Sequence, residues 1–138
     1  MALEHTPLDE AALSPAVRKV AAAAAPPPLK LMAARGMAPL PPPELVVAVY
    51  QIAATSPGVA ALVEASAKTA RELPDAVLSA ALGAPLDPRV LDYFARALLQ
   101  RSKLLPPILG NPATADETFA WLAAAGGDAI VELVAQNE

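Results

Sequence analysis

Apolar residues recur every three to four positions along most of this chain, in segments that prolines and glycines separate. This spacing places the apolar side chains on one face of an α-helix. No segment alternates between apolar and polar residues with the period of two that a half-buried strand requires. The pattern therefore predicts an all-α fold without a sheet. Helices are predicted over residues 29–35, 43–54, 57–72, 74–82, 88–100 and 115–125, with a single turn over 104–110 and a last short helix after Asp128.

Several helix starts are marked by a capping residue followed by proline. Proline suits the first helical position because its missing N–H has no partner to lose there. The side-chain oxygen of the preceding Ser, Thr or Asp accepts a hydrogen bond from the first turn. Thr114 followed by Glu117 is a capping-box pattern at the start of another helix. The pairs that predict a start in this way are Thr6-Pro7, Ser14-Pro15, Ser56-Pro57 and Asp87-Pro88.

Residues 1–42 differ from the rest of the chain in composition. The alanine run Ala21–Ala25 meets Pro26–Pro28, and a second proline-rich run covers Pro39–Pro43. Consecutive prolines favour a stiff polyproline II conformation. We therefore predict a Pro/Ala-rich N-terminal arm with short helices over 1–42 and an α-helical repeat domain over 43–138.

The second half of the chain contains an internal similarity. Leu86–Ala95 (LDPRVLDYFA) aligns with Thr114–Ala123 (TADETFAWLA), 28 residues further on, and Leu104–Asn111 aligns with Ile130–Asn137, 26 residues further on. A period in this range is typical of helical repeat proteins, in which each helical pair buries its apolar face against the next pair. In the helix predicted over 88–100, Asp92 and Arg96 form an i,i+4 pair that we interpret as a surface ion pair.

The segment Leu104–Glu138 resembles the leucine-rich repeat variant, a relative of the HEAT-type α-helical repeats. The resemblance lies in Asn111-Pro112, then Thr114 and Glu117, then Leu122-Ala123, and then an apolar stretch that ends at Asn137. It implies a short right-handed helical-repeat bundle, resembling an α-solenoid, and a scaffold that binds rather than reacts. A member of that family carries an iron–sulfur cluster, which this chain cannot ligate through cysteine because it has none. We interpret Asn111 and Asn137 as left-handed helix-end residues that bond a neighbouring turn.

Composition argues against most catalytic and metal chemistry. The 138 residues include no Cys and a single His, His5, which excludes disulfides, thiolate metal sites and thiol catalysis and leaves little for a Ser-His triad. The paired carboxylates Asp9-Glu10 and Asp116-Glu117 lie in predicted first helical turns, where negative charge favours the helix dipole. We therefore predict no enzymatic activity, no cofactor and no metal.

The stretch Leu45–Val63 is uncharged, but Gln51 and the sequence Thr55–Gly58 interrupt it. We therefore predict two helices of a soluble protein rather than a membrane span. A signal peptide is not recognisable, because the first basic residue is Arg18 and no apolar core of sufficient length follows the start. The expected location is the cytoplasm, which a chain free of Cys permits.

These observations predict a non-catalytic helical repeat module, a scaffold or adaptor, that binds another protein or a second copy of itself. The net charge of −4 disfavours nucleic acid as the partner. The last helix has no following unit to pack on, so the chain is either a piece of a longer repeat protein or is covered there by a partner. The expected contact residues are Ile130, Val131, Leu133 and Val134. The alternative is a small-ligand- or nucleic-acid-binding domain around a basic patch of Arg89, Arg96, Arg101 and Lys103.

Overall fold

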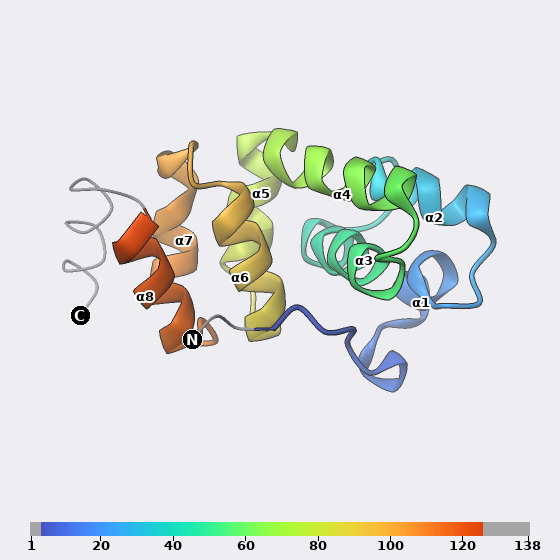
Figure 1. The fold of residues 1–138 in the computed structure, drawn as a ribbon, viewed down its shortest axis with the longest axis horizontal. Coiled ribbons are helices and arrows are strands. Elements are labelled where there is room, and N and C mark those ends of the chain that lie inside the picture. Colours follow the sequence, from blue (N-terminus) through green and yellow to red (C-terminus); the bar gives the residue numbers. More distant parts are fainter. Residues whose placement is uncertain (1–3, 126–138) are drawn as a thin grey trace.

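The computed structural model describes residues 4–125 of the chain, with the exception of the Ser102 side chain (Figure 1). Every regular element in this range is a helix, which confirms the all-α prediction for the described residues. In chain order the elements are the 3₁₀ turn η1 (Glu10–Ala12), α1 (Pro15–Ala21), α2 (Pro27–Ala34), α3 (Pro42–Thr55), α4 (Ala60–Glu72), α5 (Asp75–Leu82), α6 (Pro88–Ala97), the 3₁₀ turn η2 (Ser102–Leu104), α7 (Leu105–Leu109) and α8 (Asp116–Ala125). The helix predicted after Asp128 lies outside the described residues.

Two of the predicted proline starts are confirmed. The Ser14 hydroxyl accepts a hydrogen bond from the Val17 N–H at 3.3 Å, and an Asp87 carboxylate oxygen accepts one from the Arg89 N–H at 2.9 Å. The start predicted at Thr6-Pro7 is wrong, because residues 4–9 have no regular structure and the first turn begins at Glu10. The start predicted at Ser56-Pro57 is also wrong, because Ser56 ends α3 through its bond to the Ile52 carbonyl and α4 begins at residue 60.

The proline triplets start helices, so the polyproline II prediction fails for their last two residues. Pro26 is extended, with ψ at 137°, and Pro27 and Pro28 form the first turn of α2. Pro41 is likewise extended, and the two prolines after it start α3. The first helical turn has no intrahelical partner for its N–H groups, so residues without an N–H cost nothing there.

The helices lie in two rows along the long axis of the molecule, with α1 and α2 at one end and α7 and α8 at the other (Figure 1). In one row α1 packs on α3, α3 on α5, and α5 on α7. In the other row α2 packs on α4, α4 on α6, and α6 on α8. Helix α3 also contacts α2, α4 and α6, and so joins the two rows.

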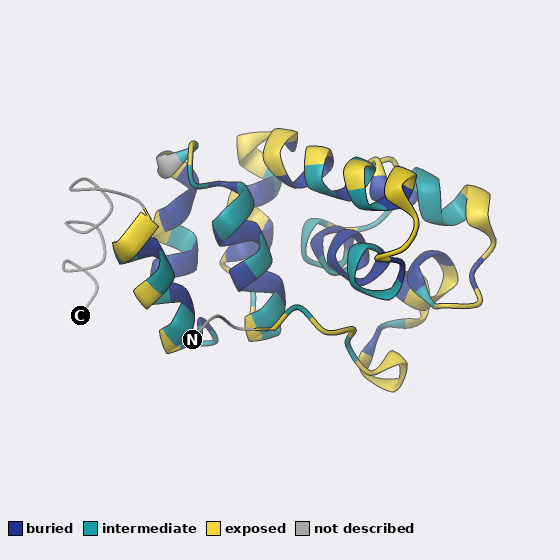
Figure 2. Ribbon diagram, in the orientation of Figure 1, coloured by how far each residue is buried: buried dark blue, intermediate teal, exposed yellow. Residues whose placement is uncertain are grey.

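A single cluster of buried apolar residues runs the length of the molecule, from Leu13 before α1 to Leu122 in α8. Every helix from α1 to α8 contributes buried residues to the interior (Figure 2). The predicted boundary at residue 42 coincides with the start of α3, and the cluster includes Val17 before it and Tyr50 after it. Helices α1 and α2 of the predicted arm therefore share their core with the rest of the molecule.

Candidate functional site

Residues Glu4–Leu8 run in an extended conformation past α6 and α3, and we call this segment the strap (Figure 1). The Tyr50 hydroxyl donates a hydrogen bond of 2.7 Å to the Thr6 carbonyl. The Gln51 amide binds both main-chain groups of Leu8: Oε1 accepts from its N–H at 2.8 Å, and Nε2 donates to its carbonyl at 3.1 Å. Side chains of α3 therefore hold the backbone of the strap.

Arg89 at the start of α6 binds the same segment. Its Nη1 donates to the Thr6 hydroxyl at 2.9 Å and to the Pro7 carbonyl at 3.1 Å. Its Nε pairs with the Asp87 carboxylate at 2.9 Å, which fixes the direction of the guanidinium group. Two helices from different rows thus meet on one extended segment.

Asp92 in α6 anchors the beginning of the strap. Its side chain is fully buried, and Oδ2 accepts hydrogen bonds from His5 Nε2 at 2.6 Å and from Arg96 Nε at 2.8 Å. Oδ1 accepts one from the Thr118 hydroxyl of α8 at 2.6 Å. Burial acts to raise the pKa of Asp92, but the hydrogen bonds from His5, Thr118 and Arg96 together hold it below its usual range. Asp92 is therefore an ionised interior anchor, and its interpretation as part of a surface ion pair was wrong.

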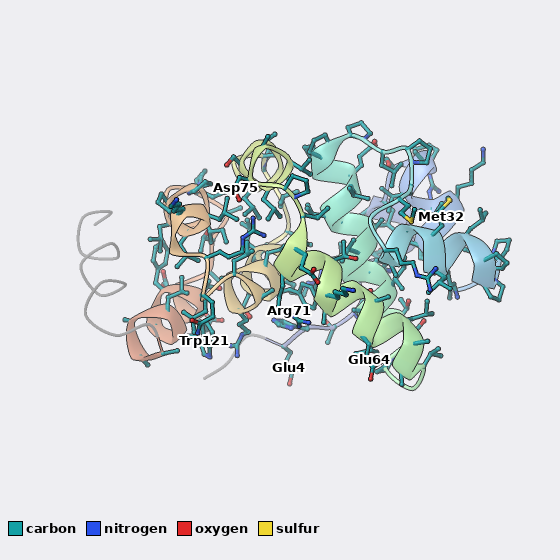
Figure 3. All side chains as sticks on the ribbon, turned by 90° about the horizontal axis from the view of Figure 1, so that it is seen from above. Glu4, Met32, Glu64, Arg71, Asp75 and Trp121 are labelled. Carbon is teal, nitrogen blue, oxygen red and sulfur yellow. The ribbon has the colours of Figure 1, made fainter. Side chains whose placement is uncertain are left out.

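Aromatic rings surround this anchor. The His5 ring stands edge-on to Tyr50 and to Tyr93, with ring centres 6.0 and 5.8 Å away. The Arg96 guanidinium lies 4.6 Å from the centre of the Trp121 ring in α8, which is a cation–π arrangement (Trp121 is labelled in Figure 3). Arg96 Nη2 is buried without a hydrogen-bond partner among the described residues.

This cluster is suited to anchoring rather than to proton transfer. Both Asp92 oxygens already accept hydrogen bonds, and a carboxyl group with a lowered pKa is a weak general acid near neutral pH. Over residues 4–125, no group of three or more His, Cys, Asp or Glu side chains could hold a metal ion. None of the helices in that range has the length and apolar character to cross a membrane.

The residues predicted as a basic patch are held by local partners. Arg89 and Arg96 bind Asp87 and Asp92, as described above. Arg101 pairs with Asp75 and donates to the Leu73 carbonyl, at the end of α4, at 2.9 Å. Lys103 is exposed and lines, with Arg101 and Asp75, a hollow of about 340 Å³. Each of the three arginines thus lies against an aspartate. The predicted contact residues Ile130, Val131, Leu133 and Val134 lie outside the described residues.

A larger groove of about 710 Å³ opens between α2 and α4, and we call it the α2–α4 groove. Its apolar lining includes Leu31 of α2, Ala61 and Ala65 of α4, and Leu73. Charged side chains alternate in sign along its α4 side, at Glu64, Lys68 and Glu72, and Arg35 lies at the end of α2. Figure 3 looks onto this side of the molecule, with Glu64 on α4 and Met32 on α2.

The end of α2 is held close to α4 by backbone geometry. Gly36 has a φ of 74°, and a Cβ added to it would lie 2.9 Å from Thr69 Cγ2. The Thr69 hydroxyl donates a 2.5 Å hydrogen bond to the Ala34 carbonyl. A residue with a side chain at position 36 would therefore be strained and would push the two helices apart.

Sequence reasoning missed Tyr50, Gln51 and Asp92 as binding residues. The one signal for Gln51 was its isolation in an uncharged, apolar run, where a polar side chain needs a specific partner. Comparisons with known proteins add no further residue, because no protein-family model, no curated protein and no solved structure matches the chain significantly.

Proposed function

We propose that this chain is a non-catalytic α-helical repeat module that binds another protein through the α2–α4 groove. The right-handed, solenoid-like architecture and the kinship with leucine-rich repeat variant or HEAT-type repeats belong to the same proposal. The two rows of helices, in which each helix packs on the next but one, support it. The proposal places the module in the cytoplasm, with another protein as its partner.

The observation that carries the proposal is the lining of the groove. Ala61 and Ala65 keep the α4 surface low, so a partner helix can approach closely, while Leu31 and Leu73 provide apolar contact. A groove of about 710 Å³ admits a few large side chains of that helix rather than its whole width. Recognition of this kind uses apolar anchors at helical spacing.

The charges on α4 specify the rest of the partner. Glu64, Lys68 and Glu72 follow one another at intervals of four residues, so their signs alternate turn by turn along one side of the groove. A partner helix with basic, acidic and basic residues at the same interval would be electrostatically complementary. We therefore expect an amphipathic helix with two apolar anchors and this order of charges.

Selection from a displayed library of helical peptides against the full chain tests the proposal. We expect enriched peptides to carry apolar anchors three or four residues apart beside basic and acidic residues in the stated order. Ala65→Arg should weaken their binding at least about tenfold, because it fills the groove. The matched control is Ala120→Arg on the exposed face of α8, which should leave binding unchanged. If no peptide is enriched, or if both substitutions weaken binding equally, the proposed function is wrong.

A further inference from the structure

We infer that the strap occupies a second binding site, in which an extended segment of a partner protein can replace it. The site is the face of α3 and α6 formed by Tyr50, Gln51, Arg89 and Asp92. The partner segment would carry the chemistry of the strap: an imidazole, then a Thr-Pro pair, then a leucine. This site is separate from the α2–α4 groove, so the inference does not rest on the proposed function.

The first step of the argument is that the site binds main-chain groups. The Thr6, Pro7 and Leu8 carbonyls accept hydrogen bonds from side chains of α3 and α6, and the Leu8 N–H donates one to Gln51 Oε1. Bonds to main-chain groups require an extended segment but not a particular sequence. The proline has no N–H that could remain unpaired, and its fixed φ favours an extended course.

The second step is that three side chains of the strap add specificity. The His5 imidazole binds the buried Asp92 carboxylate, and the Thr6 hydroxyl accepts from Arg89. The Leu8 side chain is partly buried against the core cluster. Glu4 is exposed and is not expected to matter for recognition.

The third step is that the site needs an occupant. With the strap in place Gln51 is fully buried, and the described groups that bind its amide belong to Leu8. Asp92 also loses His5 when the strap leaves but keeps Arg96 and Thr118. When the strap leaves, the Gln51 amide exchanges its paired bonds for water, so a segment that offers the same main-chain groups can restore two bonds and cover the site again. Departure of the strap does not require any helix to unfold, because the strap precedes η1 and has no regular structure.

The strap competes with any such partner because it is part of the same chain. A tethered segment acts at an effective concentration of the order of millimolar, so a free peptide should bind the unsubstituted chain weakly. Substitutions that weaken the strap but spare the site should reveal the binding of a peptide added in trans.

Fluorescence anisotropy with a labelled peptide of residues 4–10 (EHTPLDE) tests the inference on the full chain. The receiving variant is His5→Ala/Leu8→Ala, which leaves Tyr50, Gln51, Arg89 and Asp92 in place. We expect this variant to bind the peptide at least about tenfold more tightly than the unsubstituted chain does. A peptide in which alanine replaces both the histidine and the leucine should bind much more weakly.

Variants of the site itself complete the experiment. Gln51→Ala in the receiving variant should abolish peptide binding, whereas Gln100→Ala, the same change at an exposed glutamine, should not. Should Gln51→Ala lose its helical circular dichroism, Tyr50→Phe removes only the hydroxyl and should weaken binding in the same direction. Ala65→Arg should have no effect, which separates this result from the test of the α2–α4 groove.

Three outcomes would overturn the inference. The peptide could bind the receiving variant no better than the unsubstituted chain, or its binding could be insensitive to both Gln51→Ala and Tyr50→Phe. The third is a concentration-dependent dimer of the unsubstituted chain that His5→Ala/Leu8→Ala abolishes. In that case the occupant in trans is the strap of a second copy and not a partner protein.

Discussion

At the scale of single residues, the pKa values of the two tyrosines of the chain reflect how far the region around the strap is buried. Burial raises the pKa of Tyr50 to about 12, although Arg89 acts in the opposite direction. Burial also raises the pKa of Tyr93 to about 12. The folded state therefore holds the tyrosine protons more tightly than the unfolded state, whose tyrosines ionise near 10. This contribution to stability is complete below pH 10 and is lost as the pH rises from about 10 to about 12.

A spectrophotometric titration of tyrosinate checks this prediction, because the chain contains no other tyrosine. We expect almost no tyrosinate at pH 10 in the folded protein, and then ionisation together with loss of helical circular dichroism as the pH approaches 12. In concentrated urea both tyrosines should titrate near pH 10, which serves as the control. Half-complete ionisation at pH 10 with the helical signal intact would contradict the burial of these rings.

The same residues show what the sequence could not predict. His5 is 87 residues from Asp92 in the chain, yet the two side chains lie 2.6 Å apart. The i,i+4 spacing of Asp92 and Arg96 correctly predicts that the two side chains pair, but it does not reveal that Asp92 is buried. Asp92 is bound by His5 of the strap and by Thr118 in α8, and both contacts are tertiary. Local spacing cannot encode such contacts.

At the scale of elements, Asn111 links successive helices. Its Nδ2 donates to the Leu82 carbonyl at 2.8 Å and to the Ala84 carbonyl at 2.7 Å, at the end of α5. Its Oδ1 accepts from the Ala113 N–H at 3.0 Å. The left-handed conformation predicted for it is wrong, because no described residue other than glycine has a positive φ. The predicted role in bonding a neighbouring turn is confirmed.

We predict that Asn111→Ala lowers the free energy of unfolding by roughly 1–3 kcal/mol, because it leaves buried carbonyl groups without a donor. Asn111→Asp should be at least as harmful, since it keeps the acceptor but places a carboxylate against two carbonyls. Urea denaturation followed by circular dichroism measures both effects. Asn111→Ala with the stability of the unsubstituted chain would show that these hydrogen bonds contribute nothing net.

The sequence predicted which segments form helices better than it predicted the residue at which each helix begins. Asp87-Pro88 and Thr6-Pro7 carry the same local signal, and only the first starts a helix. A proline start requires that the following residues bury an apolar face, as Val90, Leu91 and Phe94 do in α6. From Thr6 to Leu8 the main-chain groups are instead bound by side chains of α3 and α6. The internal similarity with an offset of 28 residues, in contrast, aligns Pro88 with Asp116, and these are the first residues of α6 and α8.

At the scale of the whole molecule, the question is whether the predicted N-terminal arm is a separate unit. Composition alone separated residues 1–42, since their prolines and alanines suggest an arm with short helices. The structure places Val17 and Val20 of α1 in the core cluster that also contains Leu122 of α8. Burial depends on which helices meet, and a composition boundary carries no information about that. A continuous core predicts that both parts unfold together.

Trp121 is the only tryptophan of the chain and lies in α8, far along the molecule from α1 (Figure 1). We predict that Val17→Ala lowers the urea midpoint of Trp121 fluorescence and of circular dichroism by the same amount. The expected loss is about 1–2 kcal/mol, since the substitution removes two buried carbon atoms at about 0.8 kcal/mol each, and more if a cavity remains. The matched control is Val59→Ala, because Val59 is 48% exposed. This substitution should change the free energy of unfolding by less than about 0.5 kcal/mol. Helix α1 packs on α2 and α3, α3 contacts α6, and α6 packs on α8. An effect of position 17 on Trp121 must therefore pass through the shared core. Two separate transitions, with only the circular dichroism responding to Val17→Ala, would mean that the arm folds independently of the remaining helices.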